Sequence, residues 1–140
     1  MPEDCIFCKI VEGKIPSTKI FEDEHNIAIF DVNPIARAHT LFITKKHYPN
    51  LLDVPAEKIP LLFVNLPRLI SAILKSTNCE GFNIMQNNQR CAGQVIPHLH
   101  LHIIPRRPGD QLRFNWHPQH YQNDEMTKLA QIINQELSQK

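Results

Sequence analysis

The chain has 140 residues, of which 42% are hydrophobic and 21% charged, and 15 Lys and Arg against 14 Asp and Glu give a formal net charge of +1. This length fits one compact domain, and the hydrophobic content excludes a long disordered chain. The almost neutral charge disfavours a protein that binds nucleic acid or an anionic membrane through a broad positive field. We therefore expect a single domain over residues 1–140 with no nucleic-acid or membrane partner.

The N-terminal segment mixes charged residues with short apolar pieces, so it does not resemble a signal peptide. No later segment is expected to approach the roughly 20 apolar residues that a membrane-spanning helix needs. We therefore expect a cytoplasmic protein. Its four cysteines would then be reduced, and a C-x-x-C pair in that compartment indicates metal binding or redox chemistry. The cysteines are Cys5, Cys8, Cys79 and Cys91.

The apolar pattern predicts a mixture of short strands and helices. The expected strands are 26–30, 40–44, 82–86 and 98–104. Apolar side chains recur every three or four residues over 55–76, which predicts a long helix that Pro67 should kink or split. Asn123 or Asp124 is expected to cap a last helix. Strands and helices in this order indicate the α+β class rather than alternating βαβ units.

Three histidines occupy alternate positions in the last predicted strand: His98, His100 and His102. Side chains alternate between the faces of a strand, so the three imidazoles should share one face at spacings of about 6.6 to 7 Å. Such neighbours can act on one ligand, or can hold a metal and a substrate side by side. The simpler alternative is an amphipathic edge strand with its polar side chains turned outward.

A polar loop, residues 85–94, leads into this strand. Its amide side chains can bind a ribose hydroxyl or a phosphate oxygen without adding charge. Ala92-Gly93 gives the backbone a place to turn and to approach a ligand closely. An ordinary Asn-rich connection between strands is the alternative.

Cys5 and Cys8 supply half of the ligands of a tetrahedral zinc site. The chain has no second C-x-x-C pair, so the remaining ligands would be histidines. Thiolates and imidazoles together favour a closed structural zinc site over a free dithiol. The candidate histidines are His25, His39, His47 and the three of the last predicted strand.

The sequence H-x-H-x-H over His98 to His102, with two apolar residues after it and Gly93-Gln94 ahead of it, resembles the histidine-triad (HIT) family. The resemblance extends to about Arg107. Within the family, the chain is similar to the Hint branch of nucleoside phosphoramidate hydrolases, in the subgroup with an N-terminal C-x-x-C. This implies a HIT-like α+β fold with a five-stranded antiparallel sheet, one long helix and a C-terminal helix, in a homodimer that joins two sheets.

The resemblance also implies an enzyme that attacks the α-phosphorus of purine nucleoside phosphoramidates or dinucleoside polyphosphates. His100 would be the nucleophile of a nucleotidyl-histidine intermediate, which water hydrolyses to a nucleoside monophosphate. His102, when protonated, would contact the phosphate and help to protonate the leaving group. The implied substrate-binding residues are Phe7, Ile10, Ile29 and Val32 at the base, Asp31 at the ribose, Asn87 and Gln94 at the phosphate, and His39 behind the triad. The implied ligands of a structural zinc are Cys5, Cys8, His47 and His98.

The chain departs from its relatives at two places. Val95 stands where much of the family has Ser or Thr, and the 88–91 loop is bulkier than usual. Two other functions remain open. One is a zinc hydrolase in which His98, His100 and His102 or another histidine share a catalytic metal with an open water position. The other is a module that binds AMP without turnover.

Overall fold

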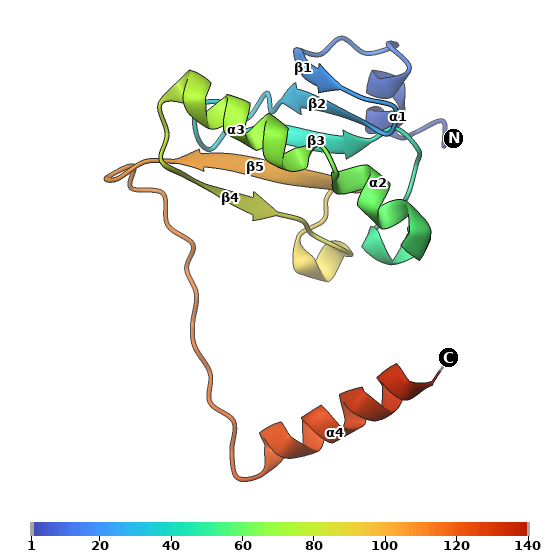
Figure 1. Cartoon of the computed structure of the whole chain (residues 1–140), viewed down its shortest axis with the longest axis vertical. Coiled ribbons are helices and arrows are strands. Elements are labelled where there is room, and N and C mark those ends of the chain that lie inside the picture. Colours follow the sequence, from blue (N-terminus) through green and yellow to red (C-terminus); the bar gives the residue numbers. More distant parts are fainter. Residues whose placement is uncertain (1, 140) are drawn as a thin grey trace.

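The computed structural model describes residues 2–139 and contains a five-stranded antiparallel sheet (Figure 1). The strands are β1 (Lys19–Glu22), β2 (Asn26–Phe30), β3 (Thr40–Thr44), β4 (Gly81–Met85) and β5 (His100–Arg106). Their order across the sheet is β1-β2-β3-β5-β4, so β4 lies at one edge. The predicted α+β class and five-stranded sheet are confirmed.

The described helices are α1 (Ile6–Val11), α2 (Ile59–Phe63), α3 (Leu66–Thr77) and α4 (Glu125–Ser138), with 3-10 turns at Leu51–Asp53, Ala56–Lys58 and Arg90–Ala92. The predicted long helix is divided, because the chain leaves the helix at Val64 and Asn65. Pro67 lies in the first turn of α3, where the missing N–H has no intrahelical acceptor to lose. The expected split near Pro67 is confirmed.

The two faces of the sheet pack against different helices. On one face, Phe42 and Ile103 pack with Leu69, Ile70 and Ile73 of α3. On the other face, side chains of β2 and β3 pack with α1; they are Ile27, Ile29, Leu41 and Ile43, with Phe7 and Cys8 opposite. In the β3–β5 register, His100 pairs with Ile43 and His102 pairs with Leu41. Paired residues point to the same face, so both histidines face the α1 side.

The stretch Ala56–Thr77, which includes α2 and α3, is long and apolar enough by length and composition to cross a membrane. This differs from the expectation that no segment would approach that limit. The core helix of a globular domain passes the same test, and Leu66, Leu69, Ile70 and Ile73 of this stretch are buried against the sheet.

The structure differs locally from the elements predicted from sequence. The helix α1 and the strand β1 had no counterpart among the elements predicted from the apolar pattern. The last strand begins at His100 rather than His98, because the chain bends at His98, whose N–H donates to the Ile96 carbonyl at 2.8 Å. His98 therefore does not share a strand face with His100 and His102, and its side chain lies among the cysteines of α1.

Candidate active site and metal centre

A cleft of about 700 Å³ opens on the α1 side of the sheet. It is lined by α1, by the segments that follow α1 and β2, by the start of β5 and by the loop after β4. His100 and His102 lie in it together with most of the predicted substrate-binding residues. The members of that set that line the cleft are Phe7, Ile10, Ile29, Asp31, Val32, His39 and Asn87.

His100 is oriented by a backbone carbonyl. Its Nδ1 lies 2.6 Å from the carbonyl oxygen of His98, so we assign the Nδ1 proton as the donor in this hydrogen bond. The Nε2 atom then carries the lone pair. Phe7 packs edge-on against the ring with the centroids 4.9 Å apart. Burial lowers the pKa of His100, which keeps that lone pair available at neutral pH.

The tautomer of His102 is set by a second hydrogen-bonded chain. The backbone N–H of Ile35 donates to Nδ1 of His39 at 3.2 Å, so the proton of His39 is on Nε2. That proton points to Nδ1 of His102 at 2.9 Å, which leaves the His102 proton on Nε2. Burial and the neighbouring His100 and His39 lower the pKa of His102 to about 4. In the unliganded site, His102 is therefore a neutral N–H donor.

Asp31 adds a carboxylate to the same wall of the cleft. Its Oδ1 accepts the backbone N–H of Asn33 at 2.8 Å, and its Oδ2 lies 3.6 Å from Nε2 of His39. Asp31, His39 and His102 could together hold a cation. However, the direct hydrogen bond between the two imidazoles already uses the facing nitrogens. We therefore assign these residues as a hydrogen-bonded network that leaves one Asp31 oxygen free of the backbone.

The loop before the histidine strand has a strained backbone. Gln89 has φ 75° and ψ 156°, a region occupied almost only by glycine, and such strain is concentrated at functional sites. Gly93 has φ 92°, and a Cβ there would lie 3.4 Å from Nδ2 of Asn87. The 88–91 loop therefore contains a strained residue close to the cleft.

Gln94 does not line the cleft, although it was predicted to contact the phosphate. Its Oε1 accepts the backbone N–H of Gln89 at 2.8 Å, and its Nε2 donates to the Pro49 carbonyl at 2.6 Å. Each end of the buried amide is thus hydrogen-bonded to the protein. Gln94 holds the strained loop in shape.

The second cluster contains the four residues predicted as metal ligands, Cys5, Cys8, His47 and His98. Nδ1 of His98 lies 3.2 Å from Sγ of Cys5, 3.6 Å from Sγ of Cys8 and 3.1 Å from Nδ1 of His47. The other nitrogen of His98 lies 2.7 Å from the Thr44 carbonyl, which we assign as its acceptor, so Nδ1 presents a lone pair. The four donor atoms lie within 4.8 Å of one another and could hold a metal ion.

This arrangement separates the three histidines of the motif. His98 belongs to the cysteine cluster, while His100 and His102 belong to the cleft. Among the described residues, the three do not form a group that could hold one metal ion. The alternative of a catalytic metal shared by these three side chains is therefore not supported.

The cleft also contains residues that the sequence did not indicate. Several follow α1, which the apolar pattern did not predict, and others flank the two central strands. They include Ile6, Ile15, Ser17, Thr18, Ile35 and Ile96. The only signal that points to them is their closeness in sequence to residues of the family motif.

The HIT domain family model matches residues 12–109, which is more than half of the chain. The chain belongs to the HIT family. Among HIT relatives, it is 42% identical to adenylylsulfatase HINT3 of Arabidopsis thaliana over 112 residues, which cover 80% of this chain and 57% of that protein. It is 34% identical to adenosine 5'-monophosphoramidase HNT1 of Candida albicans over 139 residues, which cover 96% of this chain and 91% of that protein. The predicted family is confirmed.

Two crystal structures of similar proteins match the fold over almost the whole chain. A protein from Streptococcus mutans superposes with a TM-score of 0.92 at 36% identity and covers 99% of this chain and 88% of its own. A HIT protein from Bacillus subtilis superposes with a TM-score of 0.90 at 34% identity, and the match covers 99% of this chain and 100% of that protein. The match to the Arabidopsis protein leaves more than a third of that protein uncovered.

Proposed function

We propose that this protein is a nucleotide hydrolase that cleaves the bond between the α-phosphorus of a nucleoside 5'-phosphate and a nitrogen or oxygen leaving group. The proposal rests on His100. Its imidazole is neutral, lies in the cleft, and has its Nδ1 hydrogen-bonded to a backbone carbonyl. The relatives named as an adenylylsulfatase and a monophosphoramidase support the same reaction class.

In the proposed reaction, Nε2 of His100 attacks the α-phosphorus, and the bond to the leaving group breaks with its electron pair going to that group, which takes up a proton from solvent. The intermediate is a nucleotidyl-imidazolium, whose Nδ1–H stays bonded to the His98 carbonyl. Water then attacks phosphorus and gives up a proton to solvent, the electron pair of the P–Nε2 bond returns to His100, and a nucleoside monophosphate is released. Covalent catalysis of this kind divides one difficult displacement into two easier ones.

His102 is proposed to donate its Nε2–H to a non-bridging phosphate oxygen. A donor held in place before the reaction stabilises charge that develops in the transition state. The second expected role, protonation of the leaving group, requires His102 to be an imidazolium. A pKa of about 4 in the unliganded site does not favour that state, although a bound phosphate would raise it.

The walls of the cleft provide separate sites for base and ribose. The side chains of Phe7, Ile10 and Ile29 form an apolar wall suited to a purine. Asp31 is proposed to bind the ribose hydroxyls, and Asn87, which lines the same cleft, is proposed to contact the phosphate. Val95 is 82% exposed at the rim and adds no hydroxyl contact.

The cysteine cluster is proposed to bind a structural zinc. For Zn–S distances of about 2.3 Å and Zn–N distances of about 2.0 to 2.1 Å, the edges of a tetrahedron are roughly 3.3 to 3.8 Å. The hydrogen-bond-length contacts among Cys5, Cys8, His47 and His98 are 3.1 to 3.6 Å, which is close to these edges. When bound, zinc would hold His98 and thus the start of β5 in position, and no reaction step requires it.

A substrate comparison tests the reaction class. Release of AMP is measured from adenosine 5'-phosphoramidate, adenylyl sulfate and diadenosine tetraphosphate, with the native chain, His100→Ala and the control His25→Ala. His25 lies in the turn between β1 and β2, outside the cleft. We expect turnover of at least one substrate that is lost only in His100→Ala. Tight AMP binding with no turnover of any substrate would instead indicate a binding module.

A homodimer joined at the β4 edge is also proposed. Edge strands have unpaired backbone groups, and natural proteins cover them or add charge. In β4, Phe82 and Ile84 are 43% and 45% exposed, and they border a groove of about 540 Å³ with Ile70 and Leu74 of α3. Pairing with β4 of a second copy would cover this apolar face and continue the sheet.

Sedimentation at micromolar concentration tests the dimer. We expect the native chain to sediment as a dimer, and Ile84→Lys to sediment as a folded monomer. Ser76→Lys, at the exposed end of α3 and outside this groove, adds the same charge and serves as the control. A native chain that remains monomeric would contradict the proposal.

A cytoplasmic location is proposed from the state of the thiols. All four cysteines are free, and Cys91 is exposed in the loop beside the cleft. Exposed thiols and zinc-binding cysteines persist in a reducing compartment. Fractionation of cells that express the native chain tests this placement.

A further inference from the structure

The chain beyond Leu112 leaves the body of the molecule as an arm. Figure 1 shows an extended segment that leads away past β4 and ends in α4, well separated from the sheet. We call residues 113–139 the C-terminal arm. Every residue of α4 is exposed.

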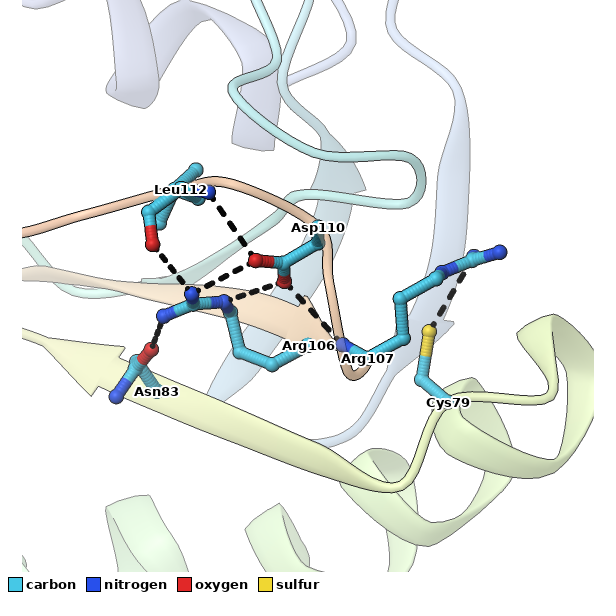
Figure 2. A network of polar contacts seen from close by, with 6 residues as sticks. All are labelled: Cys79, Asn83, Arg106, Arg107, Asp110 and Leu112. Carbon is cyan, nitrogen blue, oxygen red and sulfur yellow. Dashed lines mark hydrogen bonds and ion pairs between the residues drawn. The ribbon is translucent and has the colours of Figure 1, made fainter.

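The root of the arm is fixed to the body. Arg106, at the end of β5, donates to Asp110 at 2.7 and 2.9 Å, to the Leu112 carbonyl at 2.6 Å and to Asn83 of β4 at 2.8 Å. Figure 2 shows these contacts converging on one guanidinium. The departure direction of the arm is therefore set by β4 and β5, next to the proposed dimer edge.

The helix α4 has an apolar face with no partner in its own chain. The residues of this face recur at helical spacing and are 41% to 75% exposed: Met126, Leu129, Ile132, Ile133 and Leu137. Trp116 and Tyr121, in the extended segment, are 82% and 57% exposed. An isolated helix of this length is only marginally stable in water, so most of its stability must come from packing. With one lysine and two glutamates, α4 lacks the basic polar face of a helix that lies on a membrane.

The same placement of the arm recurs in crystals of other proteins. The arm is about a fifth of the chain. A superposition that matched only the body would therefore have a TM-score of at most about 0.8. The Streptococcus mutans and Bacillus subtilis structures superpose with TM-scores of 0.92 and 0.90, and each match covers 99% of this chain. Each is a crystal of a single protein, in which a partner protein for the arm can only be another copy. A lattice contact would not be expected to repeat between two different proteins.

We propose that the C-terminal arm reaches across to a second copy of this chain and buries the apolar face of α4 on it. Reciprocal exchange of two arms would bury Trp116 and Tyr121 as well, and would lock two bodies that meet at β4. This inference rests on the homodimer proposed above and does not depend on the reaction that the cleft catalyses.

Two measurements on the full chain test the arm. In the first, 14N- and 15N-labelled protein are mixed, allowed to exchange subunits and cross-linked through amines. Lys128 is exposed on α4. We expect peptides in which Lys128 is cross-linked to a lysine of the body to include pairs with one 14N-labelled and one 15N-labelled partner. Their share should be about that expected for random pairing of the two labelled chains. Cross-links confined to one isotope would show that the arm stays on its own chain and would overturn the proposal.

The second measurement compares Ile133→Asp with Gln131→Asp, which places the same charge on the polar side of the same helix. We expect Ile133→Asp to raise the dissociation constant of the dimer at least tenfold and Gln131→Asp to change it less than twofold. Truncation of the chain after Leu112 should raise the dissociation constant of the dimer further. Equal effects of the two substitutions would overturn the proposal. If the native chain were monomeric, both the dimer proposal and the arm proposal would be overturned. If the native chain were a dimer whose dissociation constant did not change in Ile133→Asp, only the arm proposal would be overturned.

Discussion

His98 and His100 are two residues apart, yet they lie in sites of opposite character. Both are buried and both are oriented by a backbone carbonyl. In His98 the carbonyl binds Nε2, so Nδ1 faces two thiols and another imidazole inside the core. In His100 the carbonyl binds Nδ1, so Nε2 is left for the cleft. The choice of nitrogen separates a metal-binding role from a nucleophilic one.

The largest effect expected from this comparison is the loss of activity in His100→Ala. Removal of the nucleophile should lower kcat/KM by at least about 1,000-fold, as expected when a covalent route is lost. Steady-state assays of AMP release check this. His25→Ala should keep native activity, and near-native activity in His100→Ala would disprove the assignment.

On the other side of the comparison, Cys8→Ala should mainly affect stability. Loss of a bound metal removes folding free energy, and we expect a decrease of about 3 to 5 kcal/mol in the free energy of unfolding. Urea unfolding with saturating zinc measures it, with Cys91→Ala, an exposed loop thiol, as the control. If Cys8→Ala left stability intact but abolished activity in the folded protein, the separation of the two sites would be wrong.

A smaller effect is expected from His39→Ala, which removes the residue that fixes the tautomer of His102. By analogy with the partners that orient metal-binding histidines, we expect this loss to lower activity about 10- to 100-fold. We expect kcat to fall with little change in KM, and His39→Gln, which keeps a hydrogen-bonding group, to restore part of the rate. A change in KM alone would assign His39 to substrate binding instead.

The smallest expected effect is the pH dependence that His39 and His102 give to stability. Burial lowers both pKa values, that of His102 to about 4, whereas an unfolded histidine titrates near about 6.5. Between these values the unfolded chain binds more protons, so the free energy of unfolding should fall as the pH drops from about 6.5 to about 4. Urea unfolding of the native chain and of the His39→Gln, His102→Gln double variant checks this. An equal slope in both would contradict the assignment.

Much of the fold follows from local sequence. The strands at 26–30 and 40–44 have the predicted bounds, because each is a short run of β-favouring residues buried in the sheet centre. Pro67 divides the long helix for a local steric reason. In contrast, α1 has only six residues, too few for helical periodicity to be recognised, and β1 is largely exposed at an edge.

The site was predicted more completely by family resemblance than by pattern. The alternation of His98, His100 and His102 suggested one shared face, but the chain bends at His98, and the distant Thr44 carbonyl holds the side chain of His98 in the cysteine cluster. Gln94 has the sequence position of a ligand-binding amide, yet its partners are Gln89 and the Pro49 carbonyl. Long-range contacts of this kind leave no trace in local sequence.

The most direct test of the central claim is the detection of the covalent intermediate. The native chain is mixed briefly with adenosine 5'-phosphoramidate, quenched without acid and analysed by intact-protein mass spectrometry, alongside His100→Ala and a chelator-treated sample. We predict a transient adduct of the mass of an adenylyl group that requires His100 and survives chelation. Turnover without any adduct, abolished by chelation, would contradict the account.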